Sequence, residues 1–119
     1  MRISGVVLAA LAGGCSQLFE SDSARVERLE REARALARAD GCNGVDECRA
    51  APVGDRPCGG PRTYVVYCSL TTDSAALYRK LAELRDAERE WNRKRGIGST
   101  CEFRSPPPLE AVDGTCRAR

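Results

Sequence analysis

The chain contains no histidine, and aromatic residues make up only 5% of its 119 residues. Without imidazole there is no Ser-His-Asp or Cys-His nucleophilic pair, no histidine metal ligand and no histidine proton shuttle. Lysine is also scarce, since Lys80 and Lys94 are the only two. Both fall on the polar side or end of a predicted helix, where a solvated amine is unsuited to act as a general base. We therefore expect a protein that is not an enzyme.

The chain also lacks an apolar run long enough to cross a bilayer. A shorter run, Val6 to Ala12, follows the positive start at Arg2 and leads through small residues to Cys15, which predicts an export signal over residues 1–14. The segment Leu11 to Cys15 is similar to the lipobox of bacterial lipoproteins, in which the cysteine carries a diacylglycerol. The leucine stands four places before the cysteine instead of the usual three. The alternative is an ordinary signal cut after Ala12, which leaves Cys15 a thiol.

Cysteine parity favours the lipoprotein, because seven is an odd number for an exported chain. With Cys15 joined to lipid, six cysteines remain to form three disulfides: Cys42, Cys48, Cys58, Cys68, Cys101 and Cys116. A diacylated cysteine would anchor the protein stably in a membrane. By analogy with lipoprotein sorting, Ser16 in the second mature position favours the outer membrane, with the protein facing the periplasm.

The composition argues against several other partners. The formal net charge of +2 is small, so we expect no nucleic acid. We expect no cofactor and no metal, because no two cysteines are two to four residues apart, as structural zinc sites require. Calcium is a weak alternative, since the polar residues near Cys42 and Cys48 do not have the spacing of a twelve-residue calcium loop. Those residues are Asp40, Asn43, Asp46 and Glu47.

After a short tether at residues 15–20, the pattern predicts a helix over residues 21–40. Asp22 or Ser23 would cap this helix, and Gly41 would close it after Ala39. Its apolar stripe consists of Val26, Leu29, Ala33 and Leu36. We expect this stripe to dock on the protein's own domain, because two heptads are too few to sustain a coiled coil. The alternatives are a short self-associating coil and a contact of its arginines with anionic headgroups.

Residues 41–119 are expected to form one disulfide-stapled α+β domain. A loop over 40–62 should lead to a central strand at 63–70 and then to a long helix at 74–95 that buries Leu77, Leu81, Leu84, Ala87 and Trp91. A short strand is predicted at 100–104, and Asp113-Gly114 predicts a tight hairpin. The fold class is thus a small antiparallel sheet packed by one long helix and preceded by an N-terminal helix.

Several motifs resemble an uncharacterised family of small exported bacterial proteins, many of them predicted lipoproteins. The resemblance runs from Cys48 to Cys116 and includes Cys48-Arg49, Pro57-Cys58-Gly59-Gly60-Pro61, Tyr64, Tyr67, Thr72-Asp73, Ser99-Thr100-Cys101 and Cys116-Arg117. It implies no catalytic residues. A serine often replaces Cys68 in that family, which implies Cys42 as the partner of Cys68. We interpret Gly59, Gly60 and Pro61 as a structural turn. The alternative is that this turn and the two tyrosines form a recognition surface.

The sequence therefore predicts a non-enzymatic, lipid-anchored protein of the bacterial cell envelope. It would present a disulfide-stapled accessory or binding domain to the periplasm, with an unknown envelope protein as a possible partner. The alternative is an inhibitor of a periplasmic or extracellular hydrolase, in which the loop over 40–62 would enter the active site at low entropic cost.

Overall fold

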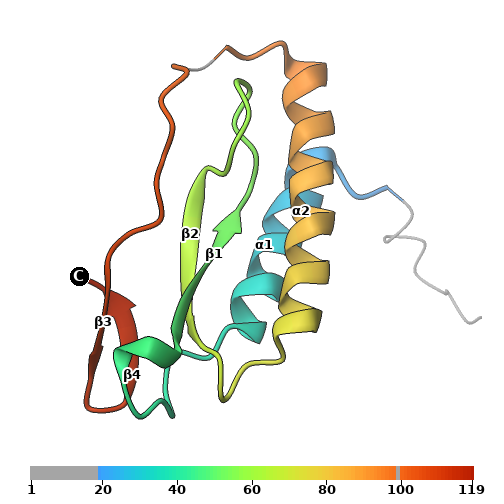
Figure 1. Cartoon of the computed structure of the whole chain (residues 1–119). Coiled ribbons are helices and arrows are strands. Elements are labelled where there is room, and N and C mark those ends of the chain that lie inside the picture. The colour runs from blue at the N-terminus through green and yellow to red at the C-terminus, as the bar shows by residue number, and fades with distance from the viewer. Residues whose placement is uncertain (1–18, 99) are drawn as a thin grey trace, which may run out of the picture.

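A computed structural model describes residues 19–98 and 100–119 of the chain. Two helices run antiparallel on one side of the molecule, and two small antiparallel sheets lie on the other (Figure 1). In chain order the elements are α1 (Asp22–Leu36), a single 3₁₀ turn (Val45–Glu47), β1 (Cys48–Val53), β2 (Thr63–Cys68), α2 (Ser74–Arg95), β3 (Leu109–Val112) and β4 (Thr115–Ala118). The predicted α+β class is confirmed. Neither helix of the described chain has the length and apolar character needed to cross a membrane.

Helix α1 docks on α2, as the sequence predicts. Its residues Val26, Leu29 and Ala33 are buried, and they pack with the buried leucines of α2 in one core. The predicted ends of α1 are wrong. Ser21 caps its start by accepting a hydrogen bond from the Ala24 amide, and the helix ends at Leu36 instead of continuing to residue 39.

Tertiary hydrogen bonds explain the early end of α1. The carbonyl of Arg38 accepts from the Cys68 amide at 2.6 Å, and the carbonyl of Ala39 accepts from the Cys116 amide at 2.8 Å. The Arg38 amide in turn donates to the Thr72 hydroxyl at 2.9 Å. Residues 37–40 are therefore hydrogen-bonded to the end of β2 and to the first half of β4. For this reason the helix stops before Gly41, the residue at which local signals would end it.

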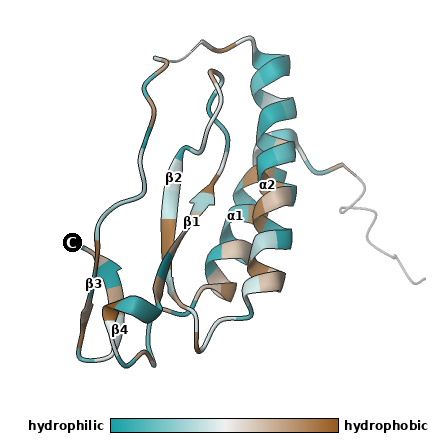
Figure 2. Cartoon of the chain, viewed as in Figure 1, coloured by the Kyte–Doolittle hydropathy of each residue, from teal (hydrophilic) through white to brown (hydrophobic). Residues whose placement is uncertain are grey.

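Helix α2 has the predicted bounds and both predicted caps. Asp73 accepts the Ala76 amide at 3.0 Å, and Gly96 closes the helix with a left-handed φ of 62°. Leu77, Leu81 and Leu84 are buried. In Figure 2 the final turns of α2 are hydrophilic, whereas its apolar residues lie further down, where the helix runs beside α1. The expectation is therefore correct for the leucines, while Ala87 and Trp91 pack only partly buried against the core.

The first sheet shows that the prediction of a loop over 40–62 is wrong. Within that range the chain forms the 3₁₀ turn and strand β1, which pairs antiparallel with β2 from Cys48 opposite Cys68 to Val53 opposite Thr63. Ala51 and Val53 from β1 join the core with Val65 and Tyr67 from β2. β2 has no strand partner other than β1 in the described chain, so the prediction of a central strand is wrong.

The second sheet is the predicted C-terminal hairpin. β3 and β4 pair antiparallel across Asp113 and Gly114, whose φ values of 51° and 78° are both positive, as a tight two-residue turn requires. The strand predicted over 100–104 is absent, because residues 100–108 form neither helix nor strand. The described residues therefore form two two-stranded sheets in place of the one small sheet that the sequence predicts.

Candidate functional site

Three disulfides staple the domain, and they use all six cysteines between residues 42 and 116. The pairs are Cys42–Cys68, Cys48–Cys116 and Cys58–Cys101. The first pair is the one that the family resemblance implies. The bridges tie the link after α1 to β2, tie β1 to β4, and tie the β1–β2 turn to the segment that follows α2.

Two of these bridges pack against each other in a buried cluster. Cys42, Cys48, Cys68 and Cys116 are all nearly inaccessible to solvent, and the sulfurs of the first, second and fourth lie within 4.8 Å of one another. A cysteine binds metal through its thiolate, and a sulfur that is joined in a disulfide is not a thiolate. The cluster therefore acts as a second small core that joins the two sheets.

The Gly59-Gly60-Pro61 segment forms the turn between β1 and β2. Gly59 and Gly60 have φ values of 95° and 80°, which are strained for other residues. The turn is closed by two backbone hydrogen bonds, from the Gly59 amide to the Arg56 carbonyl and from the Arg56 amide to the Gly60 carbonyl. An added Cβ at either glycine would meet no atom within 4 Å, so these positions need glycine for conformation and not for space.

The two tyrosines of the motif have different environments. Tyr67 is buried in the core, whereas Tyr64 is half-buried and donates its hydroxyl to the Arg104 carbonyl at 2.8 Å. The two lysines are in ion pairs, Lys80 with Glu32 and Lys94 with Asp22. Near the first two bridged cysteines, the Glu47 carboxylate accepts the amides of Asn43 and Gly44, as a residue of a local turn does.

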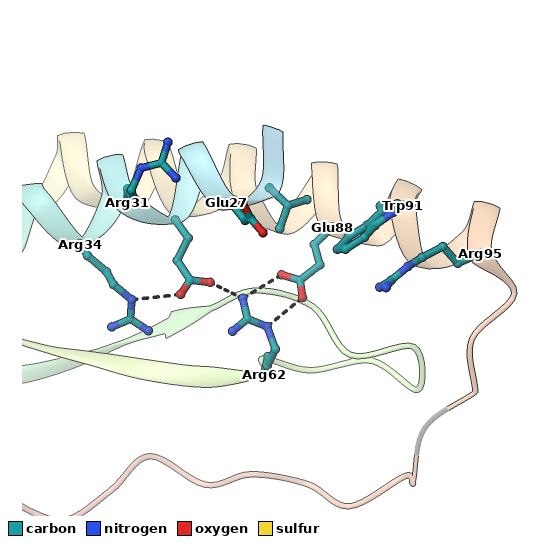
Figure 3. A pocket seen from close by; sticks show the side chains of 9 residues that line it. Glu27, Arg31, Arg34, Arg62, Glu88, Trp91 and Arg95 are labelled. Carbon is teal, nitrogen blue, oxygen red and sulfur yellow. Dashed lines mark hydrogen bonds and ion pairs between the residues drawn. The ribbon is translucent and has the colours of Figure 1, made fainter. Parts of the chain in front are cut away.

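A cavity of about 550 Å³ opens between α1, α2 and the start of β2 (Figure 3). It is lined by Val26, Glu27, Glu30, Arg31, Arg34, Arg62, Glu88, Trp91 and Arg95. This volume is within the usual range of small-molecule sites. The lining offers guanidinium groups, carboxylates and one indole ring, which can form ion pairs, hydrogen bonds and ring contacts with a small molecule.

Arg62 is the centre of the charged side of this cavity. Its Nε donates to Glu88 at 2.8 Å, and its Nη2 also pairs with Glu30, which in turn pairs with Arg34 at 3.1 Å. The Glu88 side chain is only 7% exposed. The hydrogen bond to Glu88 raises the pKa of Arg62 above its usual value. Partial burial acts to raise the pKa of Glu30, but hydrogen bonds from Arg62 and Arg34 outweigh it and lower that pKa.

The other end of the cavity contains a cation–π pair. The guanidinium carbon of Arg95 lies 3.4 Å from the centre of the Trp91 ring, and Figure 3 shows the two side chains against each other. Sequence reasoning placed Trp91 on the packed face of the helix but missed the charged cluster. The one available signal was that Glu88 follows Leu84 by four positions and thus falls on the buried face.

Gly54 provides a test of the Arg62 cluster. Its φ is 80°, and an added Cβ would lie 2.6 Å from Oε2 of Glu88 and 3.0 Å from Nη2 of Arg62. We expect Gly54→Ala to lower the free energy of unfolding by about 2 kcal/mol, from backbone strain and displacement of the ion pair. Gly60→Ala is the matched control, since Gly60 has the same φ and no nearby atoms. It should cost about 1 kcal/mol. Equal losses in urea denaturation would contradict this account.

Cys15, the predicted site of lipid attachment, lies outside the described residues. No protein-family model, no curated protein and no solved structure matches the chain. The fold and the bridges define the chain as a small α+β domain stapled by three disulfides.

Proposed function

We propose that this chain is a non-enzymatic, lipid-anchored protein of the bacterial cell envelope that presents a disulfide-stapled binding or accessory domain to the periplasm. The observation that carries the proposal is the use of the cysteines. The six described cysteines are joined to one another in three bridges, which leaves Cys15 as the seventh cysteine of the sequence. Three disulfides in so small a domain favour an oxidising compartment, because disulfides form and persist there. Attachment of lipid to Cys15 then accounts for the odd number.

The remaining features of the N-terminal sequence agree with this proposal. The apolar run before Cys15 serves as the export signal, and Ser16 directs the anchored protein to the outer membrane. The partner is then the membrane itself through the lipid, together with an envelope protein that the domain binds.

Metabolic labelling with palmitate tests the anchor. We expect the protein expressed in a bacterial host to carry the label and Cys15→Ser to lose it completely, because the thioether requires the Cys15 sulfur. Cys58→Ser is the matched control, since it removes a cysteine from a bridge and should remain labelled. Equal labelling of the wild type and Cys15→Ser would refute lipid attachment at this residue.

The second candidate is an inhibitor of a periplasmic or extracellular hydrolase. The segment over 40–62 is less suited to this role than the sequence predicts, because its middle is strand β1. A different observation favours inhibition, namely an exposed segment between α2 and β3 that is held in place by a bridge and by side chains. Failure to retain any candidate protease or lysozyme in a pull-down with the immobilised domain would remove this candidate.

A further inference from the structure

Residues 100–108, which we name the strap, lead directly into β3 and run alongside β2 (Figure 1). Every residue from 100 to 106 is exposed. The strap is not a third strand of the first sheet. A hollow of about 420 Å³ lies between them, lined by Tyr64 and Val66 on the sheet side and by Arg104 and Pro107 on the strap side.

Side chains and a disulfide nevertheless fix the strap on its inner side. Arg56 donates one Nη to the carbonyl of Thr100 at 2.8 Å and the other to the carbonyl of Glu102. Tyr64 donates its hydroxyl to the carbonyl of Arg104 at 2.8 Å. The Cys58–Cys101 bridge adds a covalent tie to the β1–β2 turn. Three alternate carbonyls of the strap, together with the side chains of Thr100 and Cys101, are thus held by the domain.

This pattern determines what the strap presents outwards. Successive carbonyls of an extended chain point to opposite sides, so the Phe103 carbonyl points away from the domain if those of Glu102 and Arg104 point towards it. Phe103 is 79% exposed, so its ring is accessible to a partner. The strap therefore offers a fixed, extended backbone with one free carbonyl and one large apolar side chain at the same residue.

We propose that the strap is an inhibitory segment that binds the active-site cleft of an endopeptidase with an apolar primary pocket. Phe103 enters that pocket, its carbonyl faces the oxyanion donors of the protease, and the flanking backbone pairs with the cleft as an added strand. The proposal rests on the binding function above and assigns its partner. It also transfers the inhibitory role from the segment over 40–62 to the strap.

Preorganisation is the physical reason why the strap would inhibit and not serve as a substrate. A free peptide loses conformational entropy when a protease binds it, whereas the strap is already held in an extended form. Arg56 and Tyr64 also hold the backbone on both sides of the Phe103–Arg104 peptide bond, at Glu102 and Arg104. The two ends created by cleavage would therefore stay in place.

The test measures inhibition constants of the oxidised, full mature protein, with chymotrypsin as the probe for an apolar pocket and trypsin as the probe for an acidic one. We expect competitive inhibition of chymotrypsin and inhibition of trypsin that is weaker by about 100-fold. Phe103→Ala should weaken inhibition of chymotrypsin by about 100-fold. Phe103→Arg should transfer inhibition to trypsin. Because Phe103 is exposed, both variants should keep the wild-type circular dichroism spectrum.

Arg56→Gln releases two strap carbonyls and should weaken inhibition by about 10-fold while allowing slow cleavage after Phe103. Arg49→Gln is its matched control, because Arg49 also donates to backbone carbonyls, those of Asp46 and Cys48, but away from the strap. It should inhibit like the wild type. Absence of inhibition by the wild type, or equal inhibition by Phe103→Ala, would overturn the proposal. With palmitate labelling of Cys15 intact, either result would leave the lipid-anchored function standing.

Discussion

Replacing Cys48 and Cys116 together with alanine is expected to lower the free energy of unfolding by about 4 kcal/mol through loop closure alone. The bridge joins residues 68 positions apart, so its loss frees most of the domain in the unfolded state. Both sulfurs are buried, and their removal also leaves a cavity in the cluster that joins the two sheets. Small domains are stable by only 5–15 kcal/mol, so the variant should be close to unfolding at room temperature.

Urea denaturation of the oxidised protein measures this effect. The comparison is the double variant Cys58→Ala/Cys101→Ala, whose bridge spans 43 positions and joins two exposed residues. The loop-closure contribution is similar for the two bridges, so the larger loss at the buried bridge should come from packing. A smaller loss for the buried pair than for the exposed pair would refute the assignment of Cys48–Cys116 to a second core.

Arg62→Ala is expected to lower the free energy of unfolding by about 3 kcal/mol, the lower end of the cost of breaking a buried ion pair. The loss arises because the Glu88 carboxylate, only 7% exposed, would lose its partner. The Arg62 side chain itself is 40% exposed, so water moderates the penalty. Glu30 would be less affected, since it keeps its ion pair with Arg34.

Two further variants separate this explanation from a loss of side-chain packing. Arg34→Ala removes another arginine of the same cavity, but one whose ion pair is more exposed, and should cost less than about 1 kcal/mol. The double variant Arg62→Leu/Glu88→Leu removes both charges and should recover most of the stability lost in Arg62→Ala. The three free energies follow from urea denaturation. Equal losses for Arg62→Ala and Arg34→Ala would show that burial of Glu88 is not the cause.

Elements whose signals are local could be predicted from the sequence. Asp73 and Gly96 mark both ends of α2, and the leucines between them have helical spacing. Asp113-Gly114 fixes the β3–β4 hairpin, because a tight turn with two positive φ values strongly favours these residues. In each case the residues that determine the structure lie within a few positions of the structure that they determine.

Elements that depend on distant partners could not be predicted in the same way. Strand β1 contains two alanines and Pro52, which are poor strand formers, and it is a strand because β2 pairs with it. Helix α1 ends early because the carbonyls of Arg38 and Ala39 accept amides from Cys68 and Cys116. No short-range pattern contains these partners, since the paired residues of β1 and β2 are 10 to 20 positions apart and Cys68 and Cys116 lie 30 and 77 positions after the carbonyls that they bind.

The candidate sites follow the same division. Arg62 and Glu88 are 26 positions apart, and their ion pair forms because the start of β2 lies against α2. The sequence predicts a short strand over 100–104, whereas in the structure this part of the strap is no strand and is held at the surface by Arg56, Tyr64 and Cys58. The sequence by itself determined the α+β class, the long helix and the terminal hairpin, since caps and turns depend on neighbouring residues. The number of cysteines available for bridges also follows directly from the sequence. The tertiary structure alone decided how Cys48, Cys58, Cys101 and Cys116 pair, where α1 ends and which side chains the surface presents, because those depend on contacts between residues far apart in the chain.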